Sequence, residues 1–408
     1  MFKGIKILVY IVVAAIALTG CVNLLEDYRE TITEHQSEPY VRPPVEQITV
    51  SDYDEFIATI IEHIMEHEAS IHLLYYQHEG EDFQAEALRA RYEIMNEHPI
   101  GAYAVANITI DPVRIVTHFE VNIEIEYKRT KEQLDSIVNT PTELAMRTQL
   151  LNKMSAYVEE AVFRTTRQIT EETITELVRD TYYQNPHRIV MLPVVTVETF
   201  PEEGADRIYE IQFSNIESPM MLQRFGELLT LHIQRNAERA EGNTDSEVLL
   251  SLVSSLMLST DFNEGASRTI HMHGAQNLAA TAYGALIRGN AVGEGFAMAF
   301  KALADELGFN CRVVLGYYDG MIHAWNIILL YGDFYHIDVA MCVVNGIETA
   351  FLKTDADFEE MYTWDRENTV RCEGELTLDD ISSLEDPSDP DDPENQDNET
   401  NDDEEDDH

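Results

Sequence analysis

The chain has 408 residues, with 75 acidic residues against 27 lysines and arginines, and a formal net charge of −48 at pH 7. This length is enough for two or three domains with a sizeable core. The charge argues against nucleic acid and anionic lipid headgroups as partners, because both are negative themselves. A solvated acidic surface is the interpretation that this composition favours.

The first residues have the pattern of a secretory signal. Lys3 and Lys6 precede an apolar run at 7–18, and Leu-Thr-Gly-Cys follows at 18–21. This ending resembles a bacterial lipobox, in which the cysteine, here Cys21, is lipidated and becomes the first mature residue. An uncleaved anchor is the alternative, but the run is shorter than the roughly 20 residues of a membrane span. We therefore expect a signal peptide at 1–20 and a lipid anchor on the extracytoplasmic face of the cell membrane.

The segments that flank the predicted domains are polar. Residues 21–46 contain prolines among polar residues and are expected to form a tether. Residues 385–408 contain 14 acidic residues and no aliphatic or aromatic side chain. Such a segment cannot bury apolar surface, so we predict a disordered acidic tail.

A helix followed by alternating strands occurs twice between these ends. Apolar residues at 56–64 have helical spacing, and residues 119–127 alternate between apolar and polar. A second helical stretch runs through 155–180, and alternation returns at 209–213. We predict tandem helix–β-hairpin units at 47–140 and 141–240, each with an antiparallel sheet covered on one side by helices.

Residues 241–384 predict a third α+β region. Helices are expected at 246–259, 275–288 and 294–307, the last followed by Gly308, a residue type favoured after a helix. Three strand-like runs follow, at 311–318, 323–332 and 333–344. A helix followed by an antiparallel meander is an α+β arrangement.

Motifs between about 275 and 342 resemble a bacterial transglutaminase-like domain of the papain-like thiol superfamily. The matching segments are AYGALIRGNAVGEGFAMAFKAL, GF-CRVV-GYY, HAWN and G-FYHIDV, in the family's order. The resemblance implies an α+β fold whose papain-like core combines helices with an antiparallel sheet, here preceded by the tandem units. It also implies thiol chemistry without a cofactor or a metal.

Carried over onto these motifs, the family's catalytic base is His323 and its orienting carboxylate is Asp338. The nucleophilic cysteine, which a helix dipole and the His–Asp pair would activate, falls on Gly293. No serine, threonine or cysteine occurs between Arg288 and Asn310, and Cys311 lies past the far end of a helix about 20 Å long. The triad is therefore predicted to be degenerate, and His323 and Asp338 can equally be a hydrogen-bonded pair between strands.

Several neighbours of this triad are candidate site residues. Gly293 is explained by a positive φ or by a close backbone approach. Trp325, Asn326 and Tyr283 are expected to line a cleft, although Trp325 also suits the core.

Two histidine patterns elsewhere suggest metal binding only weakly. His63, Glu66 and His67 match the H-x-x-E-H pattern of some metalloproteases, with both histidines on one helical face. An amphipathic support helix explains this segment better. His271 and His273 are expected in a solvated loop, so no metal site is predicted.

The leading hypothesis is a membrane-anchored lipoprotein whose transglutaminase-like domain lacks its cysteine and binds or scaffolds a peptide or cell-surface protein. One alternative is an active amide hydrolase or acyltransferase that uses His323 and Asp338 with an unidentified nucleophile. Another is a structural spacer at the cell surface. Once Cys21 is set aside, Cys311, Cys342 and Cys372 allow at most one disulfide, and the pairing stays open.

Overall fold

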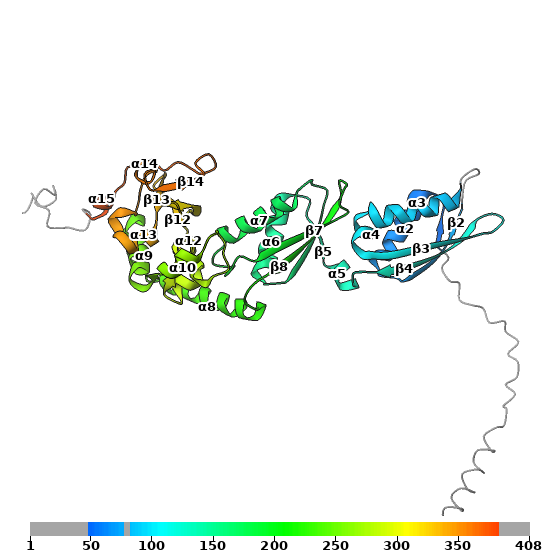
Figure 1. Ribbon diagram of the computed structural model, residues 1–408, viewed down its shortest axis with the longest axis horizontal. Helices are drawn as coiled ribbons and strands as arrows, with labels where there is room; N and C mark the ends of the chain where they lie inside the picture. The colour runs from blue at the N-terminus through cyan, green and yellow to red at the C-terminus, as the bar shows by residue number, and fades with distance from the viewer. Residues whose placement is uncertain (1–47, 77–81, 383–408) are drawn as a thin grey trace, which may run out of the picture. The chain divides into compact units, whose positions relative to one another are not determined.

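A computed structural model describes residues 48–76 and 82–382 of the chain. The predicted signal peptide, Cys21, the tether and the acidic tail lie outside these residues. The described part is α+β, as predicted, with three four-stranded sheets, one two-stranded sheet and helices (Figure 1). None of its helices is both long and apolar enough to cross a membrane.

The first unit is a four-stranded sheet with helices. Its strands have the order β1-β2-β4-β3. Its elements are β1 (Ile48–Val50), α2 (Tyr53–Met65), β2 (Ser70–Tyr75), α3 (Phe83–Asn96), α4 (Pro99–Ala104), β3 (Val105–Arg114) and β4 (Phe119–Tyr127). In β4 the side chains of Val121, Ile123 and Ile125 are buried and alternate with exposed ones, as the sequence pattern predicts.

The second unit repeats this arrangement. Its strands have the order β5-β6-β8-β7. Counted from the first strand of each unit, both sheets therefore have the order 1-2-4-3. Its elements are α5 (Lys131–Asp135), β5 (Ile137–Asn139), α6 (Glu143–Ser155), β6 (Glu160–Thr165), α7 (Glu171–Gln184), β7 (Val194–Phe200) and β8 (Arg207–Ser214). Each first long helix is followed by a residue with positive φ, His67 at 61° and Tyr157 at 52°. The internal repeat predicted from the sequence is therefore confirmed. The second sheet is mixed rather than antiparallel, however, because β5 pairs with β6 in parallel.

The predicted helix through 155–180 is wrong in one respect. The helical geometry ends at Tyr157, which has a positive φ, and the strand β6 follows. A new helix, α7, begins after Thr170, whose side chain accepts a hydrogen bond from the Thr173 amide. Val162 and Phe163 make the intervening run suitable for a strand, and both are buried in the sheet. Each unit thus contains a strand between its two long helices that the helix–hairpin prediction lacks.

The C-terminal region places helices against one antiparallel sheet of order β13-β12-β11-β14. Its helices are α8 (Pro219–Ala237), α9 (Asp245–Ser259), α10 (Glu264–Thr269), α11 (Ala282–Leu286), α12 (Gly293–Glu306), α13 (Val339–Asn345), α14 (Asp355–Phe358) and α15 (Leu378–Ser382). Its strands are β9 (Asp261–Phe262), β10 (Asn290–Ala291), β11 (Cys311–Tyr318), β12 (Met321–Leu330), β13 (Asp333–Ile337) and β14 (Tyr362–Trp364). Gly308 has φ 85° just after α12, as its predicted role requires.

Two element predictions in this region are wrong. The helix expected at 275–288 is a 3-10 turn (Leu278–Ala280) followed by α11, because Thr281 caps a new helix by accepting from the Gly284 amide. The strand expected at 333–344 ends at Ile337, because Asp338 accepts a hydrogen bond from the Met341 amide and begins α13.

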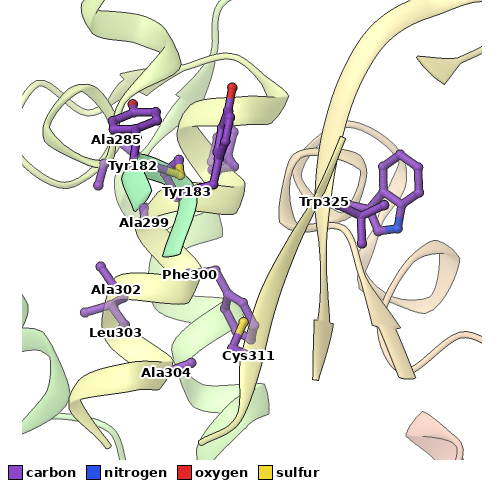
Figure 2. Packing of buried hydrophobic residues seen from close by; sticks show 14 of the residues in the cluster. Tyr182, Tyr183, Ala285, Ala299, Phe300, Ala302, Leu303, Ala304, Cys311 and Trp325 are labelled. Carbon is purple, nitrogen blue, oxygen red and sulfur yellow. The ribbon is translucent and has the colours of Figure 1, made fainter. Parts of the chain in front are cut away.

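Helix α12 is the centre of this region. Every residue from Gly293 to Ala304 is buried, so the helix is enclosed on all sides rather than amphipathic. Figure 2 shows Phe300 and Cys311 on one side of a strand, with Trp325 on its other side. Because α12 is enclosed, what can stand at its first residue is decided by the packing around it.

Candidate functional site

Gly293 begins α12 in contact with the imidazole of His323. A Cβ added to Gly293 would lie 2.3 Å from Nδ1 and 2.4 Å from Cε1 of that ring. Gly293 is not among the described glycines with positive φ, so that explanation of the glycine is wrong. The alternative, a close approach, is the one that the structure supports.

The imidazole is held in this place by Asp338. Nε2 of His323 lies 2.6 Å from Oδ2 of Asp338, and both side chains are buried. The Tyr362 hydroxyl donates to the same oxygen at 2.9 Å, and the Met341 amide donates to Oδ1 at 3.1 Å. The expected hydrogen-bond contact is therefore present, with Asp338 one residue past β13 rather than within the strand.

This arrangement fixes which ring nitrogen of His323 carries the proton. The Asp338 carboxylate accepts hydrogen bonds, so Nε2 of His323 donates, and in the neutral form of the ring Nδ1 is the nitrogen without a proton. Nδ1 lies against Gly293, where a thiol would stand in the family that the motifs resemble. The pair thus retains the geometry of a general base but faces no nucleophilic side chain.

The described cysteines do not replace the missing nucleophile. Cys311, Cys342 and Cys372 are free and buried. Burial raises the pKa of Cys311 to about 12 and that of Cys372 to about 12, and it also raises the pKa of Cys342. The backbone carbonyl of Cys311 accepts a hydrogen bond from Nζ of Lys301. Lys301 lies more than two helical turns after Gly293 on α12, so Cys311 is at a distance from the start of this helix. Such thiols are inert, because the thiolate is the reactive form.

A cavity of about 320 Å³ lies beside His323. Its wall is mainly apolar, with polar groups from α10 and α13. Besides His323, the residues that line the cavity are Phe262, Glu264, Ser267, Arg268, Tyr318, Met321, Ile322, Met341, Val344 and Asn345. A cavity of this size can hold one large side chain of a ligand, with the imidazole at its wall.

The three residues expected to line a cleft lie in the core instead. Trp325 and Asn326 are fully buried, and Tyr283 is 4% exposed. Asn326 donates through Nδ2 to the Ala297 carbonyl at 2.9 Å and so fixes β12 to α12. Tyr283 stacks on Phe225 with ring centroids 4.3 Å apart.

Glu294 is a site neighbour that the sequence analysis did not identify. Its buried carboxylate accepts hydrogen bonds from the Tyr183 hydroxyl at 2.8 Å and the Gly274 amide at 3.2 Å. Desolvation by burial raises its pKa from 4.5 to about 7. An acid between two glycines, directly before the apolar run at 296–300, was the available signal.

One group of potential metal ligands occurs among the described residues, and it does not fit a metal. Ligand atoms of His336, Asp355 and Cys372 lie within 4.8 Å of one another. However, the Trp325 indole N–H donates to Nδ1 of His336 at 3.0 Å, which leaves the proton on Nε2, 2.9 Å from Oδ1 of Asp355. An indole N–H can only donate, so Nδ1 of His336 must be the accepting nitrogen and Nε2 must carry the proton. Neither ring nitrogen then has a free lone pair for a metal.

The two histidine patterns do not form metal sites either. Helix α2 ends at Met65, and His67 has a positive φ, so His63 and His67 do not share a helical face as predicted. Nδ1 of His63 contacts the Thr59 carbonyl, and Nε2 of His67 contacts the Arg129 carbonyl. His271 is exposed, whereas His273 is half-buried, with a pKa lowered by desolvation.

No protein-family model matches the chain. No curated protein matches it either. Among solved structures, a TGase is similar at 12% identity and a TM-score of 0.26, over 53% of this chain and 60% of its own length. A candidate cysteine protease from Cytophaga hutchinsonii is similar at 13% identity and a TM-score of 0.22, over 42% and 70%. The chain thus spans less than two thirds of the TGase, and TM-scores this low carry no argument by themselves.

The raised pKa of Glu294 predicts a pH-dependent stability. Folding favours the protonated acid, so this contribution is complete below pH 4.5 and is lost as the pH rises towards about 7. The shift corresponds to about 3 kcal/mol. Glu294→Gln keeps an acceptor for Tyr183 and Gly274 but has no charge. We expect the variant to melt near the wild-type Tm at pH 4.5 and above it at pH 8.

Thermal unfolding at several pH values measures this difference. Glu306→Gln, which changes an exposed carboxylate at the other end of α12, is the control and should follow the wild type. If Glu294→Gln shows the wild-type pH dependence, this carboxylate does not titrate as inferred.

The contact between Gly293 and His323 predicts strong coupling between the two positions. Gly293→Ala adds a Cβ where the ring stands and should lower stability by about 1–3 kcal/mol, the usual cost of overpacking. In the His323→Ala background the added methyl has room, so the same substitution should cost much less. Denaturant unfolding of all four chains measures the coupling. Additive effects would mean that the ring moves away freely.

Proposed function

We propose that the chain is a membrane-anchored extracytoplasmic lipoprotein whose transglutaminase-like domain binds a peptide without cleaving it. The observation that carries the proposal is the position of the His323 ring, which occupies the space that a side chain at residue 293 would need. Thiol chemistry at this place requires an atom that the packing excludes. The His–Asp pair is then a structural remnant beside a binding cavity.

The cavity beside His323 supports binding over a purely structural role. Its apolar wall, with the aromatic rings of Phe262 and Tyr318, suits an apolar side chain. A filled core at this place would instead have favoured a spacer.

An active amide hydrolase or acyltransferase is less well supported. It would need a nucleophile other than the described thiols, because these are buried and have raised pKa values. It would also need space next to Nδ1, which the first turn of α12 occupies.

Peptide binding can be tested by NMR of chain labelled with methyl-13C methionine, because Met321 and Met341 line the cavity. We expect peptides of the form acetyl-Gly-Gly-Leu-Gly-Gly-amide, or with phenylalanine at the centre, to shift these signals. An all-glycine peptide should not shift them. Mass spectrometry should recover every peptide uncleaved.

The matched variants are Val344→Trp, at the cavity, and Val194→Trp, at a similarly exposed valine on β7. The first should abolish the shifts, and the second should leave them unchanged. Shifts that survive Val344→Trp would place binding elsewhere, and peptide cleavage that His323→Ala abolishes would establish the enzyme instead.

The anchor can be tested separately, in a bacterium that lipidates its surface proteins. Cells fed an alkyne-bearing fatty acid should incorporate it into the wild-type chain and not into Cys21→Ser. The reason is that only Cys21 follows the signal-like segment at the spacing of a lipobox. Equal incorporation in both chains would contradict the anchor.

A further inference from the structure

The β3–β4 hairpin of the first unit ends in an exposed apolar tip. Val116 is 98% exposed, Val113 is 51% exposed and Ile115 is 37% exposed. The hairpin closes tightly, with the Ile115 amide donating to the His118 carbonyl at 2.8 Å. Tyr76, 43% exposed, lies beside this tip with its ring 5.3 Å from that of His118. We define the hairpin tip as residues 113–118 together with Tyr76.

The hairpin tip also departs from the charge of the chain. Residues 113–119 contain Arg114 and His118 but no acidic residue, in a chain with 75 acidic residues. Asp111 and Glu120 border this segment. Isolated apolar side chains are common on surfaces, but three exposed apolar residues on one hairpin segment that itself contains no acidic residue, with an exposed tyrosine beside them, indicate a contact.

The second unit provides an internal comparison. Its β7–β8 hairpin has the same place in the same strand order, and its connection is Pro-Glu-Glu-Gly-Ala-Asp at 201–206. This connection carries three acidic residues and no large apolar side chain. The two hairpins share their fold, so the fold does not require an apolar tip, and the difference belongs to the first unit's surroundings.

We propose that the hairpin tip of the first unit inserts into the headgroup region of a lipid bilayer. The contact is chiefly apolar, so it suits zwitterionic lipid and is compatible with the acidic charge of the chain as a whole. Tyrosine favours this region because one end of its side chain is apolar and the other is polar.

The position of the first described strand also supports a lipid bilayer as the partner of the hairpin tip. Val50, near the N-terminal end of the described residues, accepts through its carbonyl a hydrogen bond from the Tyr76 amide. Tyr75 in turn pairs with Phe119 at the base of the hairpin. The first described strand therefore lies next to the hairpin tip, and 47 residues that include Cys21 precede it. This step rests on the proposed lipid anchor.

The test uses the full chain with Thr117→Cys, labelled with the polarity-sensitive fluorophore NBD. Thr117 is exposed within the hairpin tip, and the native cysteines of the described residues are buried, with raised pKa values that slow their labelling. In vesicles of phosphatidylcholine we expect a blue shift of the emission and quenching by doxyl-labelled lipid. Glu203→Cys, in the matching hairpin of the second unit, should show neither effect.

A second substitution tests the apolar contact itself. Val116→Asp in the labelled chain should abolish the shift and the quenching. A label that stays in a polar environment would overturn the inference, and so would a shift without lipid quenching. A shift that depends on protein concentration would instead assign the hairpin tip to a second copy of the chain.

Flotation of the same vesicles separates this inference from the proposed anchor. A chain that floats while its label stays in water leaves the anchor intact and overturns only the insertion of the hairpin tip. A chain that does not float contradicts the anchor. The hairpin tip is then tested with the full chain tethered to nickel-chelating lipid through an N-terminal hexahistidine tag, where an unshifted label again overturns the insertion.

Discussion

The close contact between Gly293 and the ring of His323 is the constraint on which the site depends. The ring stands where a side chain at the start of α12 would be, and Asp338 holds it there. Asp338 is fixed in turn by the Tyr362 hydroxyl and by its place at the beginning of α13. Because α12 is buried throughout its first three turns, it cannot shift to make room without disturbing the core around it.

Several buried polar groups around this contact are hydrogen-bonded, although Oδ1 of Asn326 has no hydrogen-bond partner among the described residues. Asn326 ties β12 to α12, while His336 receives a bond from Trp325 and donates one to Asp355. Unpaired, such groups would each destabilise the folded state, so their pairing restricts the core to one arrangement. His336 is therefore explained as a structural group between Trp325 and Asp355.

The tandem units show how one arrangement of elements can carry two different surfaces. Both have the strand order 1-2-4-3, and both place a residue of positive φ after the first long helix. Their buried faces obey the same packing requirements. Their hairpin connections, which are mostly outside the core, are free to differ, and one is apolar where the other is acidic. Differences between repeats are thus more informative about partners than the shared core.

The sequence by itself determined the α+β class, the repeat, β4, α9, α12 and the pairing of His323 with Asp338. Periodicity and short motifs report local conformation, and the motifs kept their order along the chain. It did not determine β6 or the end of β13, because a capping hydrogen bond at Thr170 or Asp338 decides where one element yields to the next.

Only the tertiary structure decided why residue 293 is glycine. The sequence left positive φ and close approach as equal explanations, since either one requires the absence of a Cβ. The deciding neighbour, His323, is 30 residues away in the sequence and meets Gly293 only when the sheet packs on α12. The burial of Trp325, Asn326 and Tyr283, and the raised pKa of Glu294, depend on the same packing. Burial and long-range contact are properties of the assembled core, and no local pattern in the sequence carries them.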